Sequence, residues 1–167
     1  SKAFSVVRLS KIYRQAESSH IVLNAHKINA GELITLDNKN KDFFFFEKKD
    51  VRSVMGALVY LVKTRLPEYI GASPFEIQVL TPMRKGELGV EHLNEVLQYY
   101  LNPASESKKE KEGRTGVFRE GDKVMQVKNN YKLEWKITNA KGFSIEEGLG
   151  VFNGDMGIIK QINTYSE

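Results

Sequence analysis

The chain has 167 residues, with 25 Lys and Arg against 21 Asp and Glu, and a formal net charge of +4. With 41% hydrophobic and 28% charged residues, it fits one globular domain, alone or with a small appendage. This composition excludes a fully disordered or fibrous protein. The basic balance suits a polyanionic partner but is also found in many proteins that bind none.

Cysteine is absent, which excludes disulfides, thiolate metal sites and a cysteine nucleophile and fits a reducing compartment. No apolar run approaches the roughly 18 residues of a membrane span, and the N-terminus has no signal-peptide pattern. We therefore expect a cytoplasmic protein without a membrane partner. A first residue other than Met suggests a piece excised from a longer protein.

Strands and helices are predicted to alternate up to residue 103. The first expected elements are a strand over 4–9 and a helix over 21–28, which is capped by Ser18 or Ser19 and stopped at Gly31. A strand over 43–46 follows, and then a helix that starts after Asp50 and ends before Pro67. The last two are a strand over 77–80 and a helix over 90–101 that ends at Asn102 and Pro103. This order predicts an α/β fold with a parallel sheet flanked by helices.

The composition changes after residue 103. Residues 104–116 are rich in Ser, Lys, Glu and Gly and lack large apolar side chains, so we expect a mobile connection there. Beyond them the pattern becomes all-β, with strands over 122–128 and 156–162 and a tight hairpin turn over 152–155. The predicted division is therefore 1–103, a connection over 104–116, and a small β domain over 117–167.

No self-contained active site is visible in the sequence. Phosphate-binding loops, the dinucleotide fingerprint, the zinc-protease motif and the serine-hydrolase elbow are all absent. His20 and His26 lack the four-residue spacing of a shared metal site, and His92 stands alone. We therefore predict no metal site and interpret the three histidines as partly exposed helical residues.

Three groups of residues are candidates for phosphate contacts. Arg14 lies at a predicted strand-to-helix junction, where a guanidinium can reach a phosphate held by another domain; a plain surface arginine is the alternative. The segment from Thr81 to Gly86 follows a predicted strand and carries two cations, or is only a solvated turn. Basic and aromatic residues also interleave in the β region, as in single-strand binding proteins or in a small hydrophobic core: Arg119, Lys123, Lys128, Tyr131, Lys132, Trp135 and Lys136.

Four blocks of the sequence together resemble the RecD-like superfamily 1 DNA helicases, which include the alpha subunit of exodeoxyribonuclease V. The blocks are 9–15, 77–94, 121–131 and 151–157. The resemblance implies a parent enzyme that couples ATP hydrolysis to 5′ to 3′ movement along single-stranded DNA in recombination and repair. It implies that residues 1–103 begin the second RecA-like motor domain, and that 117–167 belong to an inserted β-barrel of the Src-homology-3 type.

The resemblance also implies roles for individual residues. Arg14, with Gln15, matches helicase motif IV and would reach the γ-phosphate of ATP across the domain cleft. Arg84 and Lys85 match a loop that would bind DNA phosphates without recognising sequence. Asn153 to Asp155 would form only a turn. The full set of expected DNA-binding residues is Thr81, Arg84, Lys85, Asn94, Lys123, Lys128, Asn129 and Asn130.

The departures from the family limit what this chain is expected to do alone. It lacks the phosphate loop, the Mg²⁺-binding acidic motif and the later motor motifs, so ATP and Mg²⁺ belong to the parent and the fragment should not hydrolyse ATP. Expected partners are single-stranded DNA, the first motor domain of the same parent and other exodeoxyribonuclease V subunits, at the bacterial nucleoid. The barrel is expected to be cut off, with an open edge. The alternative function is a stand-alone nucleic-acid-binding module without ATP coupling.

Overall fold

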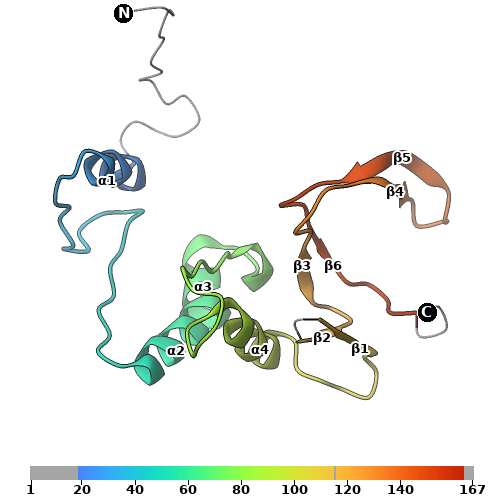
Figure 1. Ribbon diagram of the computed structural model, residues 1–167, viewed down its shortest axis with the longest axis horizontal. Coiled ribbons are helices and arrows are strands. Elements are labelled where there is room, and N and C mark those ends of the chain that lie inside the picture. Colours follow the sequence, from blue (N-terminus) through green and yellow to red (C-terminus); the bar gives the residue numbers. More distant parts are fainter. Residues whose placement is uncertain (1–18, 115, 164–167) are drawn as a thin grey trace, which may run out of the picture. The chain divides into compact units, whose positions relative to one another are not determined.

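The computed structural model describes residues 19–114 and 116–163 (Figure 1). The predicted strand over 4–9 and the predicted site residues Arg14 and Gln15 lie outside the described residues. By its internal contacts the chain divides into two compact units, Ser1–Lys48 and Lys49–Glu167.

Within the described part of the first unit lies the helix α1 (His20–Asn29), which confirms the helix predicted from the apolar spacing. The helix ends in a Schellman motif: Gly31 N–H donates to Ile28 O at 3.0 Å and Glu32 N–H donates to Lys27 O at 2.8 Å. Gly31 has a φ of 77°, the left-handed conformation that this motif requires and that glycine adopts without strain. The predicted glycine stop is therefore confirmed.

The start of α1 is capped from a distance. Ser19 occupies the N-cap position, but its side chain makes no capping hydrogen bond to the helix. Instead the His20 N–H donates to both carboxylate oxygens of Asp42, at 3.2 and 3.1 Å. A hydrogen bond from the Ser19 side chain, followed by those from backbone N–H groups and the nearby His20, lowers the pKa of Asp42 against a smaller opposing effect of desolvation.

The strand predicted over 43–46 is wrong. These residues form no strand, and Phe44, Phe45 and Phe46 are between 42% and 61% exposed. Asn38 supplies local hydrogen bonds in place of a neighbouring strand, because its side chain donates to Phe45 O at 2.8 Å and accepts from Phe45 N–H at 2.5 Å. The backbone of Phe45 is therefore hydrogen-bonded to a nearby amide side chain rather than to a sheet.

The second unit begins with a helical rod made of α2 (Val51–Tyr60), the π-helical η1 (Leu61–Arg65) and α3 (Leu66–Ile70). Asp50 caps α2 as predicted, by accepting from the Ser53 N–H at 2.8 Å. The expected end before Pro67 is wrong, since α3 continues to Ile70. The wider π turn just before Pro67 allows this, because a proline in a regular helix removes a hydrogen bond and crowds the preceding turn.

A short 3₁₀ turn, η2 (Pro74–Glu76), leads to the segment 77–80, and α4 (Val90–Leu101) follows after a loop. The helix α4 and its end at Asn102 and Pro103 are as predicted. The strand predicted over 77–80 is not formed, and Leu80 is 87% exposed. Among the described residues of this unit, the buried hydrophobic side chains are Val62, Leu93 and Ile162.

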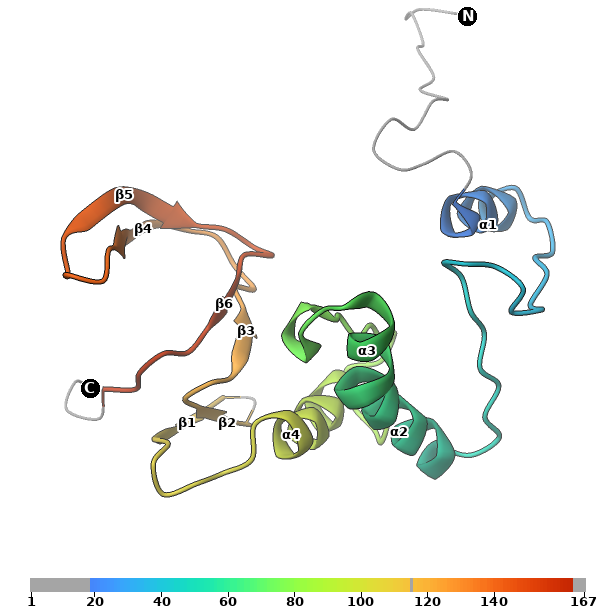
Figure 2. The same cartoon turned by 180° about the vertical axis from the view of Figure 1, so that it is seen from behind.

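The β region consists of three separate antiparallel pairs. β1 (Glu110–Gly113) pairs with β2 (Gly116–Arg119), β3 (Lys123–Met125) with β6 (Met156–Ile158), and β4 (Asn130–Thr138) with β5 (Ser144–Val151) (Figures 1 and 2). The segment 104–116, expected to be a mobile connection, contains β1, and its mobility stays a prediction. β1 has no large apolar side chain, so hydrophobic patterning could not predict it.

The chain β3–β4 and the returning chain β5–β6 form one long two-stranded ribbon. Met125 pairs with Met156, and Asn130 pairs with Val151, so the register is the same on both sides of the intervening residues. The predicted turn over 152–155 exists but is not a hairpin, because its two flanking strands pair with β3 and β4 and not with each other.

The described residues contain helices followed by small antiparallel sheets, so they form a mixed α/β chain. The parallel sheet expected from the alternation is not seen among residues 19–114 and 116–163. The two extended segments predicted to join it, 43–46 and 77–80, have no strand neighbours here.

The capping of α1 gives a pH-dependent prediction. Because the folded pKa of Asp42 is lowered, its stabilising effect on the first unit is complete above the pKa of about 3.9 of an unfolded Asp and is lost as the pH falls through the lower folded pKa. We expect Asp42→Ala to speed amide hydrogen exchange at His20 at neutral pH. The exchange rates should be measured by NMR, with Asp37→Ala as the control. Equal exchange in the two variants would contradict the capping role.

Candidate nucleic-acid interface

The segment predicted to face DNA is a closed loop on the first turn of α4, hereafter the 81–89 loop. The Thr81 hydroxyl donates to Leu88 O at 2.7 Å and so closes the loop across its base. The Gly89 N–H donates to Gly86 O at 2.9 Å. A Cβ on Gly89 would lie 2.6 Å from the backbone carbonyl of Lys85, so the loop can pack this tightly only on a glycine. Thr81 therefore shapes the loop rather than presenting its hydroxyl to a ligand.

The loop presents Arg84 and Lys85 to solvent. The Arg84 side chain is 74% exposed, and its Nε lies 3.1 Å from Glu91 Oε1, which orients the guanidinium. Lys85 is exposed. The N–H groups of Val90 and Glu91, in the first turn of α4, donate to Met83 O and Arg84 O at 3.0 and 3.2 Å. Because these helix N–H groups are already used, a phosphate here would be bound by the two side chains.

Two other residues predicted to bind DNA, Asn94 and Lys123, lie in different environments. Asn94 is exposed on α4, one turn beyond the loop. Lys123, at the start of β3, points to the helical part of the second unit, where its Nζ lies 3.3 Å from both Ile77 O and Gln78 Oε1. The Lys123 ammonium is therefore engaged in fixing β3 against the 77–78 backbone.

The predicted residues 128–130 lie at a corner where the β3–β4 chain and the 152–155 turn meet. Gly154 N–H donates to Gln126 O at 2.8 Å, and Gln126 N–H donates to Asp155 O at 2.8 Å. Asn129 also bridges the two chains, since its Oδ1 accepts from Asn153 N–H at 2.8 Å. The backbone of the turn and the Asn129 side chain thus hold the two chains together at this corner.

The three residues at this corner have different environments. The Asn129 amide donates to the Tyr131 hydroxyl at 2.9 Å, and Asn130 Oδ1 accepts from the Lys132 N–H at 3.2 Å. Lys128 is exposed, and only its carbonyl is used, by the Gln126 side chain at 2.7 Å. Of the three, Lys128 is the one whose charged group faces solvent.

The interleaved basic and aromatic residues of β4 do not share a face. Trp135 pairs across the strands with Gly148, and Lys136 pairs with Glu147, so the strand alternation puts Trp135 and Lys136 on opposite sides of the ribbon. The charge of the ribbon is also balanced, because Lys132, Lys136 and Lys141 are matched by Glu134, Glu146 and Glu147. The ribbon is thus not a basic track for a phosphate backbone.

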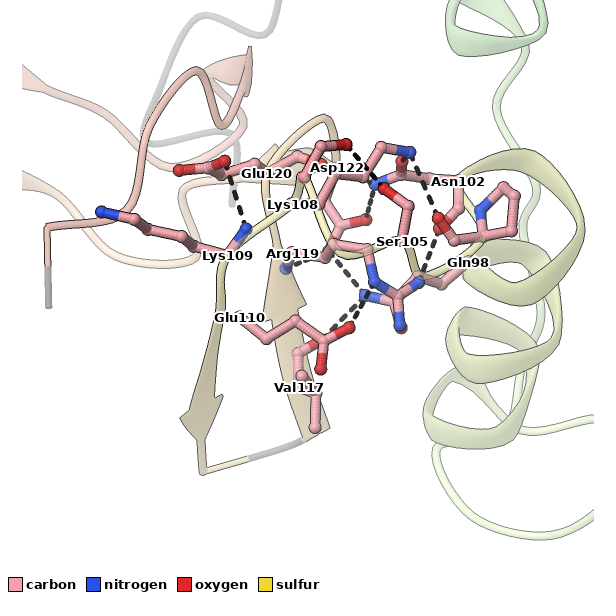
Figure 3. A network of polar contacts seen from close by, with 12 residues as sticks. Gln98, Asn102, Ser105, Lys108, Lys109, Glu110, Val117, Arg119, Glu120 and Asp122 are labelled. Atoms are coloured by element: carbon pink, nitrogen blue, oxygen red, sulfur yellow. Dashed lines mark hydrogen bonds and ion pairs between the residues drawn. The ribbon is translucent and has the colours of Figure 1, made fainter.

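A polar network joins the end of α4 to the β region (Figure 3). At its centre the buried Asp122 carboxylate accepts from Gln98 Nε2 at 2.6 Å, from Asn102 Nδ2 at 2.7 Å and from Arg119 N–H at 2.7 Å. Arg119 is also buried, and its guanidinium donates to Asn102 O at 2.6 Å and to Glu110 Oε1 at 2.6 Å. The network therefore links α4, the β1–β2 hairpin and the start of β3.

A neighbouring carboxylate extends the network to the end of the described chain. Glu120 accepts from the Ile162 N–H at 2.8 Å and from the Lys109 N–H at 3.2 Å. These two backbone hydrogen bonds lower the pKa of Glu120 despite some desolvation. Glu120 thus fastens two chain segments to the β2–β3 turn.

The sequence prediction missed this network. The sequence predicts Asn102 only as a helix terminator, and Arg119 only as one of the interleaved basic and aromatic residues of the β region. The available signal was weak: an Asn at a helix end and an Asp after a Gly are both common in turns. Clusters of His, Asp and Glu suited to a metal ion are absent from the described ranges, and no helix within them is long and apolar enough to cross a bilayer.

The network gives a stability prediction. Asp122→Ala leaves the Gln98 and Asn102 amides and the Arg119 N–H without their buried acceptor, so we expect it to lower the free energy of unfolding by about 3 kcal/mol. Urea unfolding followed by the fluorescence of the single tryptophan, Trp135, measures this. Glu112→Ala, on the exposed strand β1, is the control. A loss below about 1 kcal/mol for Asp122→Ala would show that the network is not a main support.

The comparisons with known proteins agree with the resemblance seen in the sequence. Residues 93–167 match the family model described as the ATP-dependent RecD-like DNA helicase SH3 domain. Among curated proteins, the chain is 30% identical over 159 residues to the ATP-dependent RecD2 DNA helicase of Deinococcus radiodurans. That match covers 95% of this chain and 18% of the relative's length. Residues 93–167 are therefore similar to the SH3 domain of RecD-like helicases, and the chain is distantly homologous to a RecD2 helicase of which it spans 18% of the length.

Proposed function

We propose that this chain is a part of an ATP-dependent DNA helicase that moves 5′ to 3′ along single-stranded DNA in recombination and repair. The observation that carries the proposal is the 30% identity to a RecD2 helicase over 95% of the chain. The match of residues 93–167 to the SH3 domain of such helicases supports it independently. Within the helicase, this chain provides the beginning of the second motor domain and its inserted β domain.

The 81–89 loop is the first proposed DNA contact. Arg84 and Lys85 are exposed on a backbone that is closed by Thr81 and Gly89, so their positions are restricted. Charged side chains of this kind bind phosphates regardless of base sequence, as a motor that moves along DNA requires.

Lys128 is the second proposed contact. It is exposed at the corner of the ribbon, whereas the amides of Asn129 and Asn130 are occupied within the β region. Asn129 and Asn130 therefore act by shaping the corner, and Lys123 acts by anchoring β3. Asn94, exposed on α4, lies near enough in sequence to the loop to extend the contact.

The helix α4 connects these contacts. It carries the 81–89 loop at its N-terminus and the Asp122 network at its C-terminus, about 18 Å apart for 12 residues. Movement of the motor domain would therefore reach the β domain through α4 and a set of buried hydrogen bonds. This gives the inserted domain a mechanical connection to the motor.

The ATP-related role is proposed for Arg14, with Gln15 beside it. A planar guanidinium near the γ-phosphate stabilises the charge that develops during phosphoryl transfer. ATP and Mg²⁺ would be held by the first motor domain of the parent, so this chain alone is proposed to be inactive. Other exodeoxyribonuclease V subunits and a bacterial cytoplasmic location at the nucleoid belong to the same proposal.

DNA binding by the chain is tested with labelled single-stranded DNA at about 50 and 200 mM salt. Three phosphate contacts, at a slope of about −0.7 each, predict that affinity falls roughly 20-fold between these concentrations. The double variant Arg84→Ala with Lys85→Ala should lose about two thirds of that slope, because one of the three contacts remains.

The matched control is Lys111→Ala with Lys141→Ala, which removes the same charge from exposed positions in the β region. If the two double variants weaken binding equally, general charge rather than the 81–89 loop is responsible. Absence of binding at low salt would contradict the proposed DNA contacts of this chain.

The ATP-related role is tested in the intact parent protein. Arg14→Ala should lower ATP turnover by about 10³-fold, the effect of removing an arginine that stabilises the phosphoryl-transfer transition state. Binding of ATP and DNA should be retained, which separates a catalytic loss from misfolding. Turnover near the wild-type value would contradict the role, and DNA binding without any ATP coupling would favour the stand-alone nucleic-acid-binding module instead.

A further inference from the structure

An open groove lies along the outer side of α2 and η1, beside the end of α4. Its volume is about 560 Å³, within the usual range for ligand sites. The groove is formed within the second unit, and it contains none of the proposed DNA-binding residues. The residues that line it are Arg52, Met55, Gly56, Val59, Tyr60, Lys63, Thr64 and Tyr100.

The lining combines an apolar floor with cationic ends. Met55 and Val59 are partly buried in the floor, and Gly56 lies between them in the sequence. A Cβ on Gly56 would meet nothing within 4 Å, so the groove is open above this residue. Arg52 stands near one end of the lined stretch of helix and Lys63 near the other, and no acidic residue lines the groove.

Aromatic side chains form part of the wall. Tyr60 and Tyr100 are 57% and 44% exposed. The Lys63 ammonium lies 5.8 Å from the centre of the Tyr100 ring, within cation–π distance, and this contact holds the cation at the edge of the groove. The site therefore offers both apolar and positively charged contacts.

We infer that this groove binds a short acidic segment of a partner protein that carries an apolar or aromatic side chain in its centre. The lined stretch from Arg52 to Thr64 is about 18 Å long at 1.5 Å per residue. About five residues of extended chain span that distance. The apolar centre of such a segment matches the floor at Gly56, and carboxylates on either side match Arg52 and Lys63.

The lining of the groove disfavours a nucleic acid, which binds along a continuous positively charged groove. Only two cations line this groove, and its floor is apolar. Charge complementarity therefore favours a peptide with few carboxylates and a buried apolar anchor.

The test uses the 167-residue chain and a fluorescein-labelled peptide, Glu-Glu-Leu-Phe-Glu-Glu, followed by anisotropy. Gly56→Leu fills the floor and should abolish binding, while the thermal midpoint stays unchanged or rises because leucine is the better helix former. Arg52→Glu and Lys63→Glu should each weaken binding about three- to tenfold. Lys141→Glu, with the same charge change on the β4–β5 turn, is the matched control.

Two further probes decide between occupants. The peptides Lys-Lys-Leu-Phe-Lys-Lys and Glu-Glu-Gly-Ser-Glu-Glu should not bind, since each lacks one half of the complementarity. No binding of the acidic apolar peptide, or equal binding by the Gly56→Leu variant, overturns the inference. Single-stranded DNA binding that is lost in Gly56→Leu would also overturn it and assign the groove to nucleic acid. These outcomes do not affect the proposed DNA contacts at Arg84 and Lys85, which the salt titration tests separately.

Discussion

The β region of this chain depends on the carboxylate of Asp122. It accepts hydrogen bonds from Gln98 and Asn102 on the α4 side and from the Arg119 backbone on the hairpin side. The strand β1 has no buried residue and contributes no hydrophobic free energy of its own. Polar groups removed from water are costly unless paired, so the arrangement holds only while every partner is present. A domain with so little apolar burial is thus positioned by hydrogen-bond geometry.

The sequence predicted the features that depend on residues close together in the chain. The helices α1, α2 and α4 follow from apolar side chains at helical spacing, and the cap at Asp50 and the glycine stop at Gly31 follow from hydrogen bonds within a few residues. The position of the 81–89 loop at a helix start was predictable for the same reason. Local preference and final structure agree at these positions, although the helix end expected before Pro67 and the cap expected from Ser19 show that local signals also fail.

Most of the errors occur where the partner is distant in the sequence. The strand β1 was missed because its stabilising contact is the ion pair from Arg119 to Glu110, at 2.6 Å, and not an apolar side. The phenylalanines 43–46 have a strand's composition but no strand neighbour among the described residues. Within the candidate site, Lys123 and Asn129 matched a motif, yet their polar groups bind segments 24 residues or more away. A motif identifies such residues without telling which of them face a ligand.

The distribution of charge limits how strongly this chain can hold DNA. Its net charge of +4 is not on the β4–β5 ribbon, where lysines and glutamates balance. Two further cations are less available to phosphates. The Lys123 ammonium is engaged with the backbone, and Arg84 is paired with Glu91. For the proposed DNA contacts this means that few phosphates can be neutralised at once, which implies a shallow salt dependence and a low affinity. In the proposed motor, weak contacts would let each phosphate be released as the protein advances, and tight binding would come from the rest of the proposed parent.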